Sequence, residues 1–260
     1  MKPTVLILQA TGTNRDMDAA EAFTKVGAAA EIVHIYQLKS GEKKWQDYQI
    51  LVLAGGFSYA DALGAGKLLS IDLRTYFIDE VRAFIAQKKA VIGICNGFQT
   101  LVKSGLIFEN ETNIQITEGT LTFNQSGHFE CRWVNLRPAS AKCVWIKKDQ
   151  SIIECPVAHG EGNFFVKDNK YIETLLKNDM IALRYAAPSG NPAEGSYPYN
   201  PNGSIMDIAG ICNPAGNVLG LMPHPENNIF PYQHYRRTRG NTTPTGLEIF
   251  KNGVEYANQM

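Results

Sequence analysis

The sequence predicts an α/β fold with a mostly parallel central sheet, helices on both faces and an antiparallel extension. In the first half, buried apolar runs alternate with helical segments, an order that implies right-handed crossovers between parallel strands. From about residue 114 the chain is rich in β-branched and aromatic residues with partial alternation, which is typical of antiparallel strands. The 260 residues are 44% apolar and can bury a sizeable core, so we expect one domain over 1–260.

The first half supplies the expected parallel strands. We predict strands at 4–10, 30–36, 49–56 and 90–95, and helices near 14–23 and 73–87. Ligands of open parallel sheets bind beyond the carboxyl ends of the strands. Gly55, Gly56 and Cys95 each end or follow such a strand, so they should meet at one rim of the sheet.

The second half supplies the extension. We expect strands within 114–123, 128–136 and 143–146, a hairpin over 206–226 that turns at 213–217, and a closing helix near 244–257. The stretch 186–204 is rich in Pro, Gly, Asn and Tyr and is too long for a simple connector. It is predicted to be a functional or partner-facing flap.

Composition argues against several classes of partner. Lys plus Arg and Asp plus Glu number 25 each, so no global basic field attracts nucleic acid or an anionic membrane, and the basic run 235–240 is expected to be a solvated loop. The apolar run at the start is too short for a signal peptide or a membrane span, so a cytoplasmic protein is expected. None of the five cysteines forms a C-x-x-C pair, and four of them are expected to be ordinary buried thiols.

Cys95 is the candidate nucleophile. The segment GICNG, residues 93–97, fits the pattern Gly-x-nucleophile-x-Gly, in which a strand turns sharply into a helix and leaves the central residue exposed. The helix N-terminus would favour the thiolate. A lone cysteine is more often a small buried hydrophobe, but the flanking glycines and the strand-to-helix position favour the nucleophile here.

His224 and Glu226 are the candidate base and orienting group. They lie two residues apart after an apolar run, so on an extended segment both side chains leave the same face, and Pro223 and Pro225 disfavour a helix. Alone, this segment could equally be a turn with a surface histidine. Beside a nucleophile elbow it supplies the proton carrier that a thiolate mechanism needs.

The glycines at 55 and 56 can supply an oxyanion site. Backbone N–H groups at Gly56 and at Asn96 could point at a developing negative charge, although a plain tight turn is the alternative. The sequence has no phosphate-binding glycine loop and no cluster of histidines and carboxylates with metal-ligand spacing, so we expect no metal site.

Taken together, GGFSYAD, GICNGFQ, VAHGEGNF and MPHPE, in this order, closely resemble the glutamine amidotransferase subunits of phosphoribosylformylglycinamidine synthase, which are PurQ-type class I triad glutaminases. The resemblance runs almost end to end and implies a class I amidotransferase-like, flavodoxin-like fold. It implies that Cys95 attacks the side-chain amide of glutamine, that His224 is the general base and acid, and that Glu226 orients it. It places Gly56 and Asn96 at the oxyanion, and Phe57, Gln99 and His159 at or behind the glutamine pocket.

The resemblance also implies partners. Ammonia from glutamine would pass to a PurL-type synthetase subunit that uses ATP and Mg²⁺ to make formylglycinamidine ribonucleotide in purine synthesis, with a small PurS-type subunit as a possible third component. No cofactor is expected in this chain. Ala60 and His128 depart from the usual family residues, and the added length at 186–204 and 227–244 resembles the amidotransferase domain of the fused synthase.

Two rival hypotheses stay open at this level. A cysteine hydrolase on a similar sheet could share the elbow, but it would not need a C-terminal His-x-Glu segment. A non-catalytic regulatory subunit could keep the fold without the chemistry. The presence of Cys95, His224 and Glu226 together argues against decay of the site.

Overall fold

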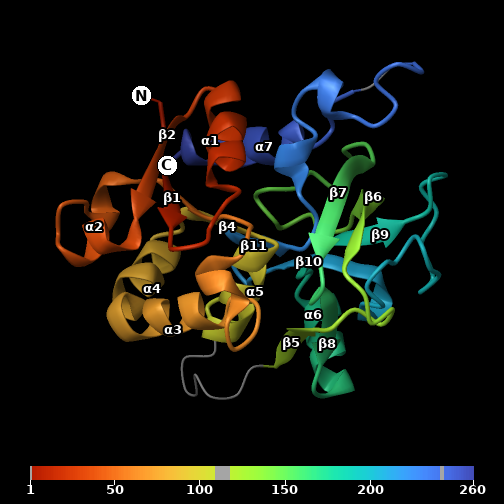
Figure 1. The fold of residues 1–260 in the computed structure, drawn as a ribbon, viewed down its shortest axis with the longest axis horizontal. Helices are drawn as coiled ribbons and strands as arrows, with labels where there is room; N and C mark the ends of the chain where they lie inside the picture. The colour runs from red at the N-terminus through yellow and green to blue at the C-terminus, as the bar shows by residue number, and fades with distance from the viewer. Residues whose placement is uncertain (1, 109–117, 241–242) are drawn as a thin grey trace.

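A computed structural model describes residues 2–108, 118–240 and 243–260 (Figure 1). Its main element is a nine-stranded sheet with the strand order β2-β1-β3-β4-β11-β10-β9-β6-β7. In chain order these strands are β1 Thr4–Gln9, β2 Ala29–His34, β3 Ile50–Leu53, β4 Ala90–Ile94, β6 Glu130–Pro138, β7 Ile153–His159, β9 Ile181–Ala186, β10 Ile208–Cys212 and β11 Val218–Leu221. The strands β2, β1, β3, β4 and β11 are mutually parallel, and the strands beyond β11 are antiparallel, as the sequence predicted.

Helices cover both faces of the parallel part. The helices are α1 Asp16–Lys25, α2 Ile35–Lys39, α3 Lys67–Tyr76, α4 Ile78–Ala86, α5 Asn96–Ser104, α6 Asn169–Lys177 and α7 Leu247–Ala257. Helices α1 and α7 contact each other on one face, and α3 and α5 contact each other on the other face (Figure 1). The predicted mostly parallel α/β class, with its antiparallel extension, is confirmed.

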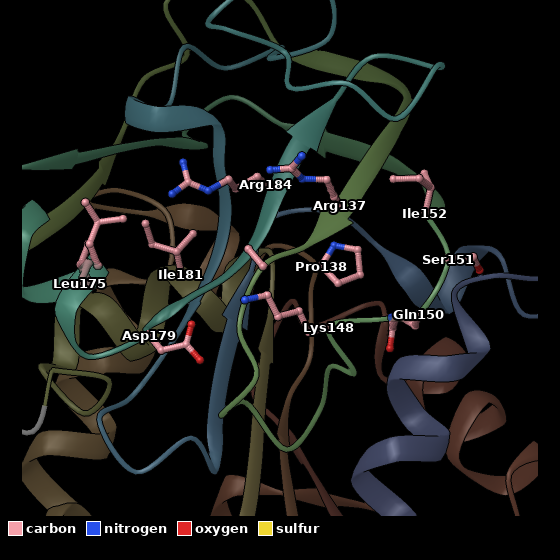
Figure 2. Close-up of a pocket in the computed structure, with 12 residues that line it drawn as sticks. Arg137, Pro138, Lys148, Gln150, Ser151, Ile152, Leu175, Asp179, Ile181 and Arg184 are labelled. Atoms are coloured by element: carbon pink, nitrogen blue, oxygen red, sulfur yellow. The ribbon is translucent and has the colours of Figure 1, made fainter.

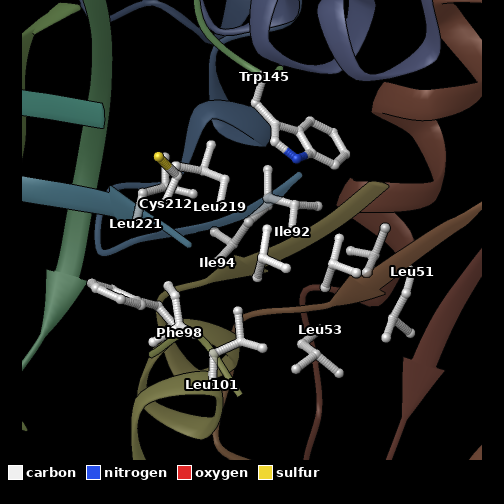
Figure 3. Close-up of a cluster of buried hydrophobic side chains, with 14 of the residues drawn as sticks. Leu51, Leu53, Ile92, Ile94, Phe98, Leu101, Trp145, Cys212, Leu219 and Leu221 are labelled. Carbon is white, nitrogen blue, oxygen red and sulfur yellow. The ribbon is translucent and has the colours of Figure 1, made fainter. Parts of the chain in front are cut away.

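The central strands are apolar on both faces because both faces are covered. Every residue of β3, β4 and β11 is buried. Figure 3 shows their side chains packed against Phe98 and Leu101 of α5 and against Trp145. This packing fixes the carboxyl ends of β4 and β11, and the candidate site residues follow both ends directly.

Several predicted elements differ from the structure. The strand expected at 30–36 ends at His34, whose side chain accepts a hydrogen bond from the Tyr36 N–H at the start of α2. The helix expected at 73–87 breaks at Phe77, where the backbone leaves the helical region (φ −141°) and the ring packs on Trp45. Residues 143–146 form turns rather than a strand, since the Trp145 side chain is buried against Phe23 instead of alternating on a sheet.

The antiparallel region is also more divided than expected. Of the strand predicted within 114–123, residues 114–117 lie outside the described residues, and β5 Gly119–Thr122 pairs with β8 Asn163–Val166 in a separate two-stranded sheet. The sequence did not predict β7, β8, β9 or α6. The predicted hairpin of β10 and β11 and the C-terminal helix are present. The assignment of residues 1–260 to one domain stays a prediction.

Candidate active site

Cys95 occupies a strained turn between β4 and α5. Its backbone has φ 51° and ψ −104°, a left-handed value that a non-glycine residue adopts only when its surroundings enforce it. The Cys95 N–H donates to the Leu221 carbonyl of the neighbouring strand at 2.8 Å, which fixes the turn. The elbow predicted from the sequence is therefore present.

The two glycines of the elbow are needed because α5 lies directly on the sheet. A Cβ on Gly97 would lie 1.8 Å from the Leu53 carbonyl oxygen, and a Cβ on Gly93 would lie 2.7 Å from the Gly97 carbonyl oxygen. No side chain fits at either position. The spacing Gly-x-Cys-x-Gly thus reflects close packing of helix against strand.

The exposure predicted for Cys95 was wrong, because only 4% of the residue is accessible. The thiol lies at the bottom of a cavity whose walls include the aromatic side chains of Phe57, Phe123 and Phe129. Phe57 lies far in the sequence from Phe123 and Phe129. The turn presents Cys95 to a cavity rather than to open solvent.

His224 and Glu226 form a buried pair beside the elbow. The distance from His224 Nδ1 to Glu226 Oε1 is 2.6 Å, and the two residues are 3% and 1% exposed. The backbone N–H of His224 donates to the Pro156 carbonyl of β7 at 2.8 Å. The segment from Pro225 forms a single 3₁₀ turn rather than the expected extended chain, and it still brings the two side chains together.

The charge of His224 depends on its two neighbours. Burial alone would lower the pKa of His224, but the Glu226 carboxylate and the Cys95 side chain outweigh burial and raise it to about 10. An imidazolium held by Glu226 on one side and by Cys95 on the other is therefore favoured at neutral pH. Its contribution to stability is fully present below the ordinary pKa of 6.5 and is lost as the pH rises through about 10.

Gly56 and Asn96 border the elbow as predicted. Gly56 lines the cavity with φ +122°, and a Cβ there would lie 2.4 Å from Asn14 Oδ1, so only glycine fits. Asn96 is the first residue of α5, and the first N–H groups of a helix have no intrahelical acceptor. Their assignment to an oxyanion site stays a prediction.

The cavity has a volume of about 170 Å³, below the range typical of sites for large ligands. Its wall is made by Gly56, Phe57, Asp61, Ala65, Cys95, Gln99, Phe123, Phe129, Ala158, His159, Gly160 and Glu161. The three residues predicted for the pocket, Phe57, Gln99 and His159, thus line the same cavity as Cys95. Gln99 donates through Nε2 to the Glu161 carbonyl at 2.7 Å and accepts from Asn96 Nδ2 at 3.3 Å, so it supports the wall.

The buried His159 ring has one nitrogen, Nε2, without a hydrogen-bond partner among the described residues. Its Nδ1 lies 3.1 Å from Asn124 Oδ1. Because the Asn124 amide nitrogen donates to two backbone carbonyls, its oxygen is the acceptor and the proton of His159 sits on Nδ1. Burial, followed by the nearby His224, lowers the pKa of His159 to about 3, so the ring is neutral.

Asp61 and Glu161 are cavity residues that the sequence reasoning missed. Burial raises the pKa of Asp61, and its carboxylate accepts from Asn96 Nδ2 at 2.7 Å. Glu161 pairs with Lys103 at 3.3 Å. Both residues belong to motifs that carried the resemblance, GGFSYAD and VAHGEGNF, so position within a motif was the available signal.

The remaining predicted features have mixed outcomes. Cys143, Cys155 and Cys212 are buried, but Cys131 is exposed because it points to the solvent face of β6. The basic run 235–240 is exposed as expected. Among the described residues, no group of histidines, cysteines and carboxylates could hold a metal ion, and no helix is long and apolar enough to cross a membrane.

The stretch 186–204 is attached to the wall of the cavity. Asn202 Nδ2 donates to the Gly162 carbonyl at 2.7 Å and to the Tyr185 hydroxyl at 2.9 Å. Gly162 in turn packs on the His159 ring, because a Cβ there would lie 2.2 Å from His159 Cε1. A movement of this flap would therefore reach the cavity. Its role toward a partner stays a prediction.

An α/β sheet with a cysteine elbow and a buried His–Glu pair beside it defines the class of cysteine–histidine–carboxylate triad proteins. Residues 2–257 match the family model of the CobB/CobQ-like glutamine amidotransferase domain. The chain belongs to this glutamine amidotransferase family.

Individual relatives cover nearly the whole chain. The phosphoribosylformylglycinamidine synthase subunit PurQ of Treponema denticola is 51% identical over 268 residues, which cover 98% of this chain and 99% of the relative. The subunit of the same name from Methanococcus maripaludis is 39% identical, over 99% and 98% of the two chains. A chain in the structure of PurLQS from Thermotoga maritima superposes with a TM-score of 0.71 at 28% identity, over 98% of this chain and 99% of that one.

Proposed function

We propose that this chain is the glutaminase subunit of a phosphoribosylformylglycinamidine synthase, hydrolysing glutamine at Cys95 and delivering the ammonia to a synthetase subunit. The observation that carries the proposal is the buried His224–Glu226 pair beside Cys95, which lines a small cavity, in a chain 51% identical to a PurQ subunit over almost its full length. The decisive assay is glutamine hydrolysis coupled to formylglycinamidine ribonucleotide synthesis in the assembled synthase.

The arrangement accounts for each step of the hydrolysis. The Cys95 thiolate attacks the side-chain amide carbon of glutamine, and the N–H groups at Gly56 and Asn96 bind the resulting oxyanion. The His224 imidazolium gives its proton to the departing nitrogen, which leaves as ammonia. The neutral imidazole then takes a proton from water, and the resulting hydroxide attacks the glutamyl thioester. Glutamate forms, the sulfur leaves as a thiolate, and the thiolate–imidazolium pair is restored. Glu226 holds the ring and stabilises its charge throughout.

The polar cavity wall suits the amino-acid end of glutamine. An α-ammonium group needs an acceptor, and the Asp61 carboxylate on the cavity wall supplies one. Glu161 already pairs with Lys103, so it contributes mainly by fixing the wall. Phe57 covers the cavity and excludes water from it.

The partners follow from the assembly named for the structural neighbour. That structure contains PurL, PurQ and PurS, so we assign a PurL-type synthetase and a small PurS-type subunit as partners of this chain. ATP and Mg²⁺ would bind the synthetase, with no cofactor in this chain. A cytoplasmic location fits a subunit that supplies ammonia for nucleotide synthesis.

Partner binding should activate the glutaminase. We expect the isolated chain to be nearly inactive and the rate to rise roughly hundredfold on adding the synthetase with its substrate and nucleotide, which needs about 2.7 kcal/mol of preference for the competent conformation. The link from Asn202 through Gly162 to His159 offers a route for that preference. The measurement is glutamate release against synthetase concentration. Full activity of the isolated chain, indifferent to the partner, would favour an independent hydrolase.

Replacing Asp61 with Asn should weaken glutamine binding. The neutral amide keeps the shape but loses the charge that faces the substrate ammonium, so we expect KM for glutamine to rise about tenfold or more, with a smaller change in kcat. Steady-state glutaminase kinetics of the complex measure both. The control is Asp149→Asn on an exposed turn away from the cavity. An unchanged KM in Asp61→Asn would remove Asp61 from the substrate site.

Replacing Glu226 with Gln should change the pH profile as well as the rate. Without the carboxylate, burial dominates and the pKa of His224 falls from about 10, so the alkaline limb of kcat/KM should move to lower pH. The loss of rate should be smaller than that caused by removing His224 itself. A pH–rate series on both forms tests this. Superimposable profiles would mean that Glu226 does not set the charge of His224.

A further inference from the structure

A second, larger cavity lies away from Cys95. It has a volume of about 560 Å³ and is bordered by the ends of β6 and β9, by α6 and by the loop 148–152 (Figure 2). Glu130 begins β6 and lies opposite His159 of β7, which lines the first cavity. Arg137 lies seven residues further along β6. At about 3.4 Å per residue the two sites are therefore about 24 Å apart. Nothing in the proposed glutaminase chemistry uses this second cavity.

Two arginines face each other on its wall. Arg137 of β6 and Arg184 of β9 are direct register partners in the antiparallel pair, so their side chains leave the same face of the sheet. Figure 2 shows both side chains along one side of the cavity. Like charges directly opposite each other destabilise a sheet. Burial lowers the pKa of Arg184, and Arg137 lowers it further.

Among the described residues, the guanidinium groups of this pair have few polar partners. Neither arginine forms an ion pair with any described carboxylate, and the one hydrogen bond from their guanidinium groups is Arg184 Nη1 to the Met206 carbonyl at 2.7 Å. Asp207 lies near Arg184, but its two carboxylate oxygens accept from the N–H groups of residues 194 and 195 and from Asn200. Asp207 raises the pKa of Arg184, so it offsets part of this positive charge through space without forming an ion pair.

The carboxylate in the cavity lining, Asp179, already accepts hydrogen bonds from neighbouring groups. Asp179 Oδ2 accepts from the Ser140 hydroxyl at 3.1 Å and from the backbone N–H groups of Ala141 at 2.8 Å and Lys142 at 3.1 Å. Lys148 adds a third cation to the lining. The lining of this cavity thus holds three cationic side chains and one carboxylate, in a chain with equal numbers of acidic and basic residues.

The rest of the wall is mixed, with polar Gln150 and Ser151 beside several apolar residues. Ile181 and Leu175 lie on one side of the cavity in Figure 2, and Pro138 and Ile152 lie on the other. Ile181 and Leu175 are buried, so the apolar surface belongs to the body of the fold. An inorganic anion would contact the cationic side chains and leave the apolar part of the wall uncovered. A ligand that joins an anionic group to a flat, weakly polar ring would use both.

We propose that this cavity is a binding site for a nucleotide, with the phosphates on Arg137, Arg184 and Lys148 and the base against the apolar wall. Guanidinium groups bind phosphate oxygens in pairs, and two of them at adjacent register positions can hold one phosphate between them. The bound phosphate would offset the repulsion between the two guanidinium groups. A volume of about 560 Å³ is within the range of small-molecule sites.

The test is calorimetric titration of the full chain at low salt with AMP and ATP, and with inorganic phosphate and adenosine as partial probes. We expect the nucleotides to bind, the partial probes to bind more weakly, and the affinity to fall as salt is added. Arg137→Gln and Arg184→Gln should each weaken nucleotide binding about tenfold or more. The matched control is Arg82→Gln on exposed α4, which should leave binding unchanged.

The double variant Arg137→Gln/Arg184→Gln separates loss of a site from loss of the fold. Because the substitutions remove repulsion, its thermal unfolding temperature should equal or exceed that of the parent chain while nucleotide binding is lost. Absence of nucleotide binding to the parent chain, or binding that survives the double variant, overturns the proposal. If nucleotides do not bind and the double variant instead weakens assembly with the synthetase, the arginine pair is a protein-docking surface and the proposal is also overturned.

Discussion

Cys95→Ala should abolish glutamine hydrolysis and glutamine-dependent synthesis by the assembled synthase. The thioester route requires the sulfur, and no other described cysteine lines the cavity, so we expect a loss of at least about 10⁴-fold. Alanine fits the site because it is smaller than cysteine, and it removes the sulfur that contacts His224 and the Ala158 carbonyl. The measurement is glutamate release and product formation with glutamine as nitrogen donor.

Two controls make this result specific. Synthesis from ammonium salts should survive in Cys95→Ala, because the ammonia-using site lies on the partner. Cys131→Ala, which changes an exposed thiol on β6, should behave as the parent chain. Retained glutaminase activity in Cys95→Ala would remove the cysteine from the mechanism.

His224→Ala should cost about as much as losing the nucleophile. The imidazolium both favours the thiolate and supplies the proton for the departing nitrogen, and members of such a unit have strongly non-additive effects. We therefore expect the double variant with Cys95→Ala to be no slower than either single variant. Glutaminase rates of the three variants in the complex provide the comparison.

The matched control for the imidazole is His128→Ala, since His128 is exposed on a turn. Its rate should equal that of the parent chain. A His224→Ala variant that keeps the parent rate would reduce the segment MPHPE to a structural turn. It would also leave the rival hypothesis of a non-triad cysteine hydrolase in place.

The sequence predicted the parts of the site that depend on local geometry. The elbow followed from glycine spacing, and the structure explains that spacing by the contact of Gly97 with the Leu53 carbonyl. The pairing of His224 with Glu226 followed from their separation of two residues after a buried strand. The residues of each feature lie within a few positions of one another in the chain, so their spacing could be recognised from the sequence.

The predictions that failed concern contacts between segments that are distant in the chain. Cys95 is buried at a cavity that Phe123 and Phe129 also line, and these residues reach it from a distant part of the chain. Trp145 lies in a segment that looks like a strand by composition, but packing against Phe23 holds it in a turn. Residue patterns describe which side chains prefer burial. They do not specify which distant element will cover them.

The sequence likewise did not predict that Arg137 and Arg184 lie side by side. The two residues are far apart in the chain, and only the register of β6 against β9 places them opposite each other. The sequence-level balance of acidic and basic residues excluded a global field, and it could not exclude a local one.

The central claim is that glutamine reacts with Cys95 inside the small cavity, and covalent trapping tests it most directly. The assembled synthase is treated with a glutamine analogue that carries an electrophilic diazoketone in place of the side-chain amide, and the labelled residue is located by peptide mass spectrometry. We predict a single adduct on Cys95 that forms in step with loss of glutaminase activity and is prevented by excess glutamine. Loss of activity with the adduct on Cys131 or another residue, or Cys95 labelling that leaves glutamine hydrolysis intact, would contradict the account.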